Sequence, residues 1–452
     1  MKTELPSVEK LNRLAKAIMQ RHGVDYPEAL RLLASFRLFI AVSPEVAAFP
    51  QYQAALLTAV NTGKRAFLGG VSVAVPEDVH CVLPGWGGLS LSQVVLSLGG
   101  TRATNPPQGA RSLGIGPAKA VDLVVAADTW RTALLSPEAA SPFLLGPAVP
   151  LAGVLGAALA VGRLFLDSAG ISLLRPGEPV GISLWEPGLP WRSPEAAGPE
   201  LVRLPSKLWL LGLGHLGQAY LWALGFLPFP ADQSATFFLQ DYDRITEGNG
   251  SAGLLCEEAD MGAYKTRIGA RWIEQRGVRT ALLERPFDEL TRCGPKEPRV
   301  ALCGFDSASG RRLLENANFD LVIECGLGSS LDHFDRLVLH TFPEASKRPD
   351  QIWAQEEPVA TDFDPALFGV KVENEECGIL IEQLAKKSIS ASFVGATAAA
   401  FAVAELLRGL HGGRRFEFML FHLRSDLSLQ IVTKDEVYPL RHARNGTLLR
   451  AA

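Results

Sequence analysis

Apolar and polar residues along this chain follow two regular patterns, one helical and one extended. Residues 1–60 keep a helical spacing of apolar positions, which continues through the segment PEALRLLASFRLFI. Spacings of three and four residues place such side chains on one face of a helix. The sequence therefore predicts an N-terminal helical segment over residues 1–60. The apolar members of its first stretch are Leu11, Leu14, Ala15, Ile18 and Met19.

The stretch from residue 206 to residue 266 has a pattern typical of a nucleotide-binding half. A buried strand over Leu208–Leu211 precedes a glycine turn and an apolar helix. Glycine lets the backbone approach a phosphate, and the helix directs its free N–H groups at it. The next strand, ATFFLQ, ends at Asp241, where a carboxylate can accept hydrogen bonds from a ribose. The glycines with G-x-G-x-x-G spacing are Gly212, Gly214 and Gly217.

Polar residues further along favour ATP over a nicotinamide dinucleotide. The glycine turn alone suits both, because NAD-dependent oxidoreductases use the same motif. Lys265, in the run DMGAYK, supplies a cation for a polyphosphate, and Asp306 ends a third apolar strand. ATP bound with magnesium needs a cation and an acid of this kind, whereas a neutral nicotinamide needs neither.

Taken together, the ordered motifs resemble the ubiquitin-activating enzyme superfamily, with its ThiF/MoeB-type adenylation fold. The order is G-x-G-x-x-G, D-x-D, Asn, D-x-G-x-x-K and D-x-x-x-x-R, and it covers residues 207–426. The superfamily includes the adenylyltransferases of thiamin and molybdopterin sulfur carriers. The resemblance implies ATP and Mg²⁺ as cofactors. It implies phosphate contacts from Gly212, Gly214, Gly217, Asn249 and Lys265, a ribose contact from Asp241, magnesium on Asp306, and further nucleotide contacts from Asp243 and Arg311.

Two departures from the superfamily pattern affect the site. The Arg-Gln pair that usually follows the Asn is replaced by Ala252 and Gly253, so one phosphate-binding cation is missing locally. We interpret Arg13 and Arg21 as surface charges, with the alternative that one of them supplies this cation from the other half. The sulfur-carrier branch usually holds zinc with two C-x-x-C pairs, and this sequence contains none.

A weak internal repeat predicts that the chain contains two related halves. Gly153–Leu164 aligns with Gly395–Leu406, with six of twelve positions identical, and an apolar strand follows each run. Upstream, VDLVVAADTWR is similar to RVALCGFDSASGR, so Asp128 aligns with Asp306. Gly85 and Gly87 suggest a degenerate glycine turn. The first half lacks room for the D-x-D and lysine segments. The predicted fold is therefore α/β, with two doubly wound Rossmann-like adenylation folds, the first degenerate and the second active.

Composition and spacing give the predicted domain boundaries. Asp306 and Gly395 are much farther apart than Asp128 and Gly153, so the second half carries an insertion. The proline-rich stretch before Ser206 is typical of a linker. The boundaries are a helical segment at 1–60, a degenerate half at 61–190, a linker at 191–205, and an active half at 206–452 with an insertion at 340–390.

The six cysteines are scattered without paired spacing, which indicates reduced thiols in a cytoplasmic protein. Cys303 and Cys325 lie in apolar strands and are interpreted as packing residues. Cys377 has polar neighbours and precedes the small-residue helix, where the superfamily commonly carries its catalytic cysteine. We therefore expect Cys377 to form a thioester, although Glu373, Glu375 and Glu376 would raise its pKa.

Charge and hydropathy limit the choice of partner. The net charge of −4 gives no electrostatic reason for binding nucleic acid or an anionic membrane. The apolar runs 148–166 and 391–407 are rich in alanine and glycine and carry Arg163 and Glu405, so we expect buried helices rather than membrane spans. The N-terminus has no apolar core of a signal peptide.

The expected function is activation of the C-terminal carboxylate of a ubiquitin-like protein by adenylation, then thioester formation and transfer to a conjugating enzyme. The resemblance is greatest to two-half activating enzymes of bacterial ubiquitin-like conjugation operons, some linked to phage defence. Three alternatives remain at this point. They are a sulfur-carrier adenylyltransferase without a thioester step, an NAD-dependent oxidoreductase, and a non-catalytic scaffold.

Overall fold

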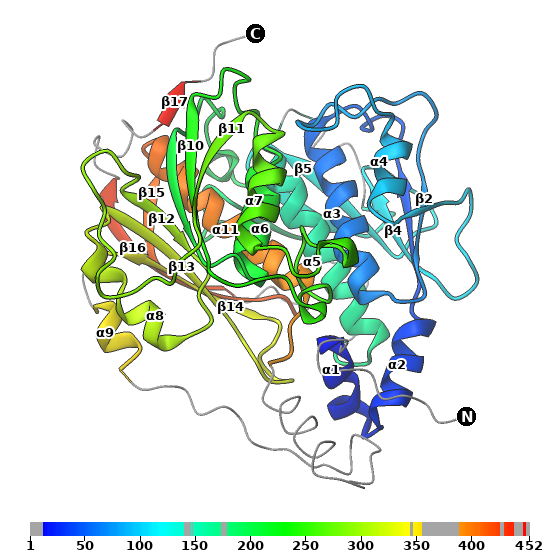
Figure 1. Ribbon diagram of the computed structural model, residues 1–452. Coiled ribbons are helices and arrows are strands. Elements are labelled where there is room, and N and C mark those ends of the chain that lie inside the picture. Colours follow the sequence, from blue (N-terminus) through cyan, green and yellow to red (C-terminus); the bar gives the residue numbers. More distant parts are fainter. Residues whose placement is uncertain are drawn as a thin grey trace, which may run out of the picture.

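Two sheets, one from each half of the chain, enclose a shared layer of helices (Figure 1). The computed structural model describes residues 12–139, 146, 148–172, 179–343, 347–354, 388–424, 429–437 and 446–448. The expected insertion at 340–390 falls largely outside these residues, and Cys377 with it.

The first sheet has seven strands in the order β3-β2-β1-β4-β5-β6-β7. The strands up to β5 pair in parallel, and the last two pair antiparallel. They are β1 (Leu38–Val42), β2 (Val71–Ala74), β3 (Thr101–Arg102), β4 (Arg111–Ile115), β5 (Leu123–Asp128), β6 (Arg131–Leu135) and β7 (Val180–Ser183).

The second sheet has eight strands in the order β11-β10-β9-β12-β13-β14-β15-β16. Its strands up to β13 are parallel and the last three are antiparallel. They are β9 (Lys207–Leu211), β10 (Ala235–Gln240), β11 (Val278–Leu283), β12 (Val300–Cys303), β13 (Leu321–Leu327), β14 (Arg336–Phe342), β15 (Arg414–His422) and β16 (Leu429–Val437). A separate pair joins β8 (Arg203–Pro205) to β17 (Gly446–Leu448).

Local sequence explains where several helices begin. The side chains of Asn12 and Asp25 accept hydrogen bonds from backbone N–H groups of α1 and α2, and Ser90 caps α4. Proline is the first residue of α3 and α5, where its missing N–H leaves no bond unmade. The helices are α1 (Arg13–His22), α2 (Tyr26–Ser35), α3 (Pro50–Ala66), α4 (Leu91–Ser97), α5 (Pro150–Ser168), α6 (His215–Leu224), α7 (Lys265–Glu274), α8 (Ala308–Arg312), α9 (Pro349–Ile352) and α11 (Ser392–Leu410), with short 3-10 turns η2 (Pro194–Ala197), η3 (Glu247–Asn249), η4 (Glu258–Asp260) and η5 (Leu314–Ala317).

The two halves have the same strand order, which confirms the predicted pair of Rossmann-like folds. In each half, the first strand (β1 or β9) pairs with the second strand on one side and with the fourth strand on the other. A long helix precedes the last antiparallel strands, α5 before β7 in the first half and α11 before β15 in the second. The repeat segments form these long helices, α5 and α11, which pack against each other.

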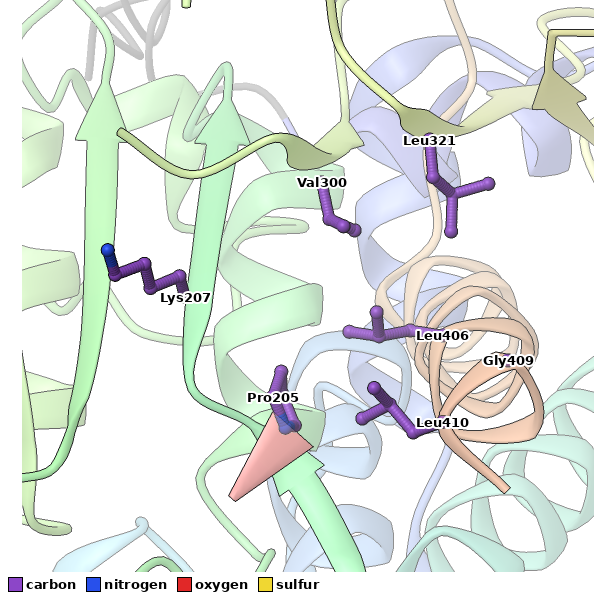
Figure 2. Close-up of a pocket in the computed structure, with 7 residues that line it drawn as sticks. All are labelled: Pro205, Lys207, Val300, Leu321, Leu406, Gly409 and Leu410. Carbon is purple, nitrogen blue, oxygen red and sulfur yellow. The ribbon is translucent and has the colours of Figure 1, made fainter. Parts of the chain in front are cut away.

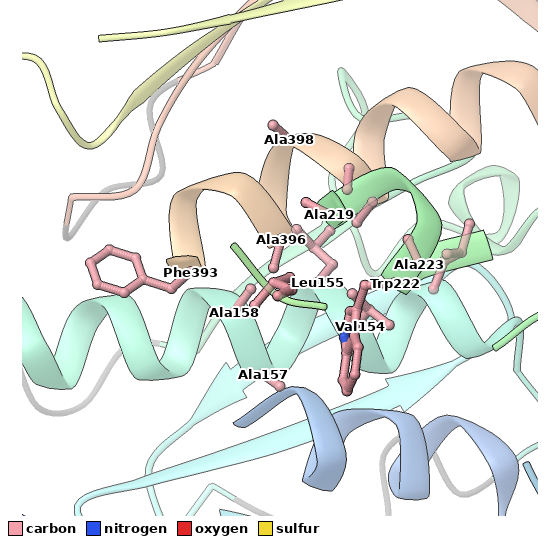
Figure 3. Close-up of a cluster of buried hydrophobic side chains, with 14 of the residues drawn as sticks. Val154, Leu155, Ala157, Ala158, Ala219, Trp222, Ala223, Phe393, Ala396 and Ala398 are labelled. Carbon is pink, nitrogen blue, oxygen red and sulfur yellow. The ribbon is translucent and has the colours of Figure 1, made fainter. Parts of the chain in front are cut away.

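Small residues allow the central helices to approach closely, and the apolar side chains of α5, α6 and α11 gather between them (Figure 3). A Cβ atom added at Gly153 on α5 would lie 1.8 Å from the carbonyl oxygen of Gln51 on α3. One added at Gly162 would lie 2.9 Å from the ring of Phe393 on α11. The alanine and glycine residues shared by the two repeat segments therefore allow close helix packing.

Three expectations about the first half are wrong. Asp128 ends β5, which corresponds to β13, so it is not the counterpart of Asp306 after β12. Gly85 and Gly87 follow β2 rather than the first strand, so they form no phosphate loop. The helical segment predicted over residues 1–60 is interrupted, because β1 (Leu38–Val42) is a strand of the first sheet, whereas residues 50–60 lie in α3.

Helices α5 and α11 are long and apolar enough to cross a membrane, but 89% and 100% of their apolar windows are buried inside the protein. They therefore have the environment of core helices. Beside α11, a small apolar cavity of about 10 Å³ has room for no more than one water molecule (Figure 2). Its lining residues are Pro205, Lys207, Val300, Leu321, Leu406, Gly409 and Leu410.

Candidate nucleotide site

The order of strands in the second sheet reverses between β9 and β12, and the glycine loop lies at the carboxyl ends of these two strands. In open α/β sheets, this switch point is where ligands bind. Gly212 has φ +78°, and a Cβ there would lie 3.2 Å from the carbonyl oxygen of Gly304. A Cβ at Gly217 would lie 2.0 Å from the carbonyl oxygen of Gly212, whereas one at Gly214 would face open space. The loop is thus compact underneath and open at Gly214.

Asp241 holds the glycine loop in place. Its carboxylate accepts hydrogen bonds from the backbone N–H of Leu213 at 2.6 Å and of Asp243 at 2.8 Å. Burial raises the pKa of Asp241, while the Lys265 charge and these two N–H donors oppose the rise. A carboxylate has about four lone-pair positions, so these two bonds use about half of them.

Lys265 lies beside the same loop. Its ammonium is mostly buried and lies 2.7 Å from a carboxylate oxygen of Asp243, whose side chain is about half exposed. The backbone N–H of Lys265 also donates to the carbonyl of Asp243. Asn249 accepts hydrogen bonds from the N–H and hydroxyl of Thr246 and so fixes its own turn. Asp241, Asp243 and Lys265 therefore lie together, with Asp243 and Lys265 already paired, whereas the side chain of Asn249 contacts Thr246.

Arg13, the first residue of α1, is partly buried and its Nε is fully so, which shows that the interpretation of Arg13 as a solvated surface charge is wrong. Burial lowers the pKa of Arg13, and the Asp306 carboxylate partly offsets this effect. The Arg13 charge also contributes to lowering the pKa of His215, the first residue of α6. Arg13 therefore lies near both sides of the switch point, whereas Arg21 donates to the carbonyl of Gly170 at 2.7 Å.

Arg311, which was expected to contact the nucleotide, forms an ion pair with a buried acid of the sheet. Its Nε lies 2.8 Å from a carboxylate oxygen of Glu324, which is 1% exposed on β13. Burial raises the pKa of Glu324, and the Arg311 charge opposes that rise. The pair ties the segment that follows Asp306 to the sheet, so Arg311 supports the loop from beneath.

The backbone around Ala252 and Gly253 has no space for the side chains that the superfamily usually has there. Ala252 is buried, and a Cβ at Gly253 would lie 2.6 Å from the side-chain oxygen of Gln218. The same oxygen accepts hydrogen bonds from the N–H groups of Leu255 and Cys256. The segment is thus packed against α6, which explains why a cation has to come from elsewhere.

The corresponding switch point of the first half is filled. Val46, in the loop between β1 and α3, is fully buried, and its side chain lies 2.3 Å from where Gly116 would carry a Cβ. Counting from the last paired residues of β1 and β4, Ala118 stands where the second half has Asp306. Counted in the same way from the last paired residues of β1 and β2, Val75 replaces Asp241. This half has neither the open loop nor the acids.

Five of the six cysteines lie in the described part of the chain, and each has a raised pKa because of burial. The pKa of Cys293, which is partly exposed, rises to about 12. These thiols are therefore poor nucleophiles near neutral pH. Cys377, the predicted nucleophile, lies outside the described residues.

Asp306 is exposed at the switch point and suits a magnesium ion bound mainly through phosphate oxygens and water. Within the residues that the structure describes, no cluster of three His, Cys, Asp or Glu side chains could hold a metal by itself. A resident metal of the zinc type has no ligand set in that part of the chain.

Sequence reasoning missed two residues of this site. His215 lies at the start of α6, where its Nδ1 is 2.7 Å from the hydroxyl of Ser390. Burial, with the nearby charges of Arg13 and Arg65, lowers the pKa of His215 to about 3. Its place inside the glycine motif was the available signal. For Glu324, the only signal in the sequence was a charged residue within an otherwise apolar strand.

Comparison with known proteins assigns a class and then a family. The model of the BilD N-terminal domain matches residues 37–184, and that of the BilD C-terminal domain matches residues 204–413. The bacterial E1-like protein BilD of Collimonas sp. (strain OK412) is 38% identical over 423 residues, which cover 90% of each chain. The molecule is thus of the E1-like class, as its motifs indicated. Within that class, the chain belongs to the BilD family.

Among solved structures, the crystal structure of E. coli MccB is 15% identical and aligns with a TM-score of 0.34, over 50% of this chain and 62% of that chain. The crystal structure of E. coli MccB with ATP aligns with a TM-score of 0.33 and 14% identity, over 50% of this chain and 64% of that chain. In both, the alignment spans less than two thirds of the MccB chain. The family assignment therefore rests on the BilD matches.

Proposed function

We propose that the second half uses ATP to adenylate the C-terminal carboxylate of a ubiquitin-like protein. The observation that carries this proposal is the asymmetry of the two switch points. The second has an open glycine loop with Lys265, Asp306 and Arg13 around it, whereas Val46 closes the first. Membership of a bacterial E1-like family supports the same chemistry.

The first step is attack by a carboxylate oxygen of the partner on the α-phosphorus of ATP. The new bond gives an acyl-adenylate, and the bond from the α-phosphorus to the bridging oxygen breaks with release of pyrophosphate. Negative charge develops on the phosphate oxygens, so fixed cations and N–H dipoles stabilise the transition state. In this proposal, the N–H groups of the Gly212–Gly217 loop, Lys265 and Arg13 do this, and Asp241, which bonds the N–H of Leu213, orients the loop.

A magnesium ion, when bound, would be held by Asp306 and would neutralise phosphate charge. For Lys265 to reach the phosphates, its ammonium has to exchange the carboxylate of Asp243 for phosphate oxygens. Since that carboxylate is about half exposed, the pair is weak enough to open when an anion of higher charge arrives.

The second step of the proposal is attack by the Cys377 thiolate on the acyl carbon. The thiol has first lost its proton to solvent; a thioester then forms as the bond between the acyl carbon and the AMP oxygen breaks, and AMP leaves. The raised pKa values of the five described cysteines favour Cys377 for this role. The acyl group then passes to a ubiquitin-conjugating-like enzyme. A cytoplasmic location and a phage-defence setting stay predictions from the sequence.

Pyrophosphate exchange tests the first step. Labelled pyrophosphate should enter ATP only when the cognate ubiquitin-like protein is present, and Asp306→Ala should lower the exchange rate at least a hundredfold. Asp332→Ala, which removes another exposed carboxylate of the same half, is the matched control and should keep full exchange. Normal exchange by Asp306→Ala would remove Asp306 from the site.

Other outcomes of the same assay identify the alternatives. Exchange without any cysteine adduct would favour a sulfur-carrier type of adenylyltransferase. Absence of exchange together with nicotinamide fluorescence changes would indicate an oxidoreductase. Absence of both with every candidate ubiquitin-like protein would indicate a scaffold.

A further inference from the structure

The glycines Gly85 and Gly87, which form no phosphate loop, belong to a loop of the first half that contacts the second half. The loop follows β2 and carries Trp86, a buried side chain. Gly85 has φ +84°, and a Cβ there would lie 2.8 Å from the guanidinium carbon of Arg276. Glycine is therefore needed at this position, both for the backbone conformation and for the close approach of the two halves.

Arg276, which follows α7, lies between two tryptophan rings. Its guanidinium carbon is 4.5 Å from the ring centroid of Trp86 and 3.3 Å from that of Trp272 on α7. Nη1 of Arg276 also donates to the carbonyl of Trp272 at 2.6 Å. Burial lowers the pKa of Arg276 to about 9, so the guanidinium stays charged at neutral pH. The negative faces of the two rings stabilise this buried charge.

The same rings join α7 to α6, the helix that begins at the glycine loop. Trp272 stacks on Trp222 of α6 with 4.9 Å between ring centroids, and Trp272 Nε1 donates to the carbonyl of Leu221 at 2.7 Å. Trp222 Nε1 in turn donates to the hydroxyl of Thr58 on α3 at 3.0 Å, so Trp222 points from α6 toward the first half (Figure 3). We call Trp86, Trp222, Trp272 and Arg276 the aromatic clamp. It ties α6 and α7 to the first half.

Helix α7 has Lys265 at its start and the aromatic clamp at its other end. Lys265 and Trp272 are seven positions apart, which is about 10 Å along an α-helix. The backbone N–H of Lys265 donates to the carbonyl of Asp243, and its ammonium lies 2.7 Å from the carboxylate of the same residue. Since the backbone of a helix moves as one unit over this length, the clamp at Trp272 sets the direction in which the Lys265 side chain leaves the helix.

The segment before Lys265 also contacts the first half. Asn61 Nδ2, on α3, donates to the carbonyl of Leu254 at 2.9 Å, and Lys64 Nζ lies 2.7 Å from the carboxylate of Glu257. The first half therefore holds the chain on both sides of Lys265, at residues 254–257 and at the end of α7.

We propose that Trp86 and Arg276 are positioning residues, which fix α7 against the first half so that Lys265 is aligned with the phosphates of the nucleotide. This inference rests on the proposed function. It gives the first half, whose own switch point is filled, a part in the chemistry of the second half.

The first test measures pyrophosphate exchange by variants of the full chain. Trp86→Leu should lower kcat about tenfold, because a displaced cation stabilises the transition state less well. Trp86→Phe should restore most of the rate, since a ring face still covers Arg276. Trp185→Leu is the matched control and should keep the wild-type kcat. Trp185 also lies where the halves meet, packed on Trp130 and against Gly413, but outside the clamp.

The control defines what would overturn the positioning role. A wild-type rate in Trp86→Leu would do so, and so would an equal loss of rate in Trp185→Leu, because contact between the halves in general would then set the rate. If Trp86→Leu does not fold, Arg276→Lys takes its place with the same expected loss, since an ammonium cannot stack flat between two rings.

The second test asks whether the aromatic clamp acts through Lys265. In a Lys265→Ala background, Trp86→Leu should lower the exchange rate less than twofold, because the group that the clamp positions is absent. A tenfold loss in both backgrounds would show that Trp86 affects the rate by another route and would overturn the proposal.

A readout without ATP separates this inference from the proposed function. Amide hydrogen exchange in α7 should be faster in Trp86→Leu than in the wild type and unchanged in Trp185→Leu. If the wild-type protein incorporates no labelled pyrophosphate into ATP, the proposed function fails, and this comparison still decides whether the aromatic clamp fixes α7. Unchanged protection of α7 in Trp86→Leu would overturn the clamp itself.

Discussion

Lowering the pH should destabilise the protein through His215, well before most carboxylates are protonated. Burial lowers the pKa of His215 from 6.5 to about 3, with the charges of Arg13 and Arg65 acting in the same direction. The folded state therefore binds fewer protons than the unfolded state below pH 6.5. Stability due to the neutral imidazole is complete above that pH and is lost progressively as the pH falls toward 3.

The size of the effect follows from the two pKa values. Linkage with 6.5 in the unfolded state and about 3 in the folded state gives a loss of about 2.5 kcal/mol between pH 7 and pH 4.5. That is a large part of the stability of an ordinary domain. His215→Asn keeps a polar group near the Ser390 hydroxyl but cannot become charged in this range.

Urea unfolding at pH 7 and pH 4.5 measures this difference. The wild-type protein should lose about 2.5 kcal/mol more than His215→Asn between the two pH values. His333→Asn, at an exposed histidine, should follow the wild type. Equal losses in wild type and His215→Asn would refute the reasoning, because the imidazole would then titrate alike in both states.

Two other substitutions test the helix packing and the thiol. Gly153→Ala places a methyl group 1.8 Å from the Gln51 carbonyl, so it should destabilise the protein by about 2 kcal/mol despite a propensity gain of about 1 kcal/mol. Gly87→Ala, which meets nothing within 4 Å, should change urea stability by under about 0.5 kcal/mol, and equal effects would contradict the packing. Cys377→Ala should keep pyrophosphate exchange and lose the reductant-sensitive adduct on a non-reducing gel. An adduct formed at the normal rate would assign the thioester to another cysteine.

Local sequence was enough to predict the nucleotide-binding fold pattern of the second half. The strand at Leu208–Leu211, the glycine turn and the following helix lie where the apolar pattern placed them, and Asp241 directly follows β10. The strand, the turn and the helix are each set by residues within a few positions of one another, whereas the bond from the Leu213 N–H to Asp241 joins residues 28 positions apart. Short-range motifs of this kind are readable because their spacing is fixed by backbone geometry.

The first half shows that apolar periodicity does not determine the place of a strand in the sheet. VDLVVAADTWR was matched to the strand before Asp306, but β5 turns back at Asp128 into the antiparallel β6. A buried parallel strand and a buried hairpin strand have the same apolar run, so their place in the sheet is not visible in the sequence. For the same reason, the strand Leu38–Val42 was taken as a continuation of the preceding helix.

The site residues supplied by distant segments were the hardest to predict. Arg13 and Asp306 are separated by most of the chain, and the electrostatic effect of Asp306 on Arg13 arises only in the folded protein. Val46 closes the first switch point by contact with Gly116, although neither residue stands out in the sequence. Both are consequences of tertiary packing, which no local pattern specifies.

The most direct test of the account maps where ATP binds. Amide hydrogen exchange with and without a non-hydrolysable ATP analogue and magnesium should show slower exchange in residues 212–217 and 241–243. The loop at residues 43–49 of the first half should be unchanged, because Val46 fills that switch point. Protection of residues 43–49, or none in residues 212–217 at saturating analogue, would contradict the assignment of the nucleotide site to the second half.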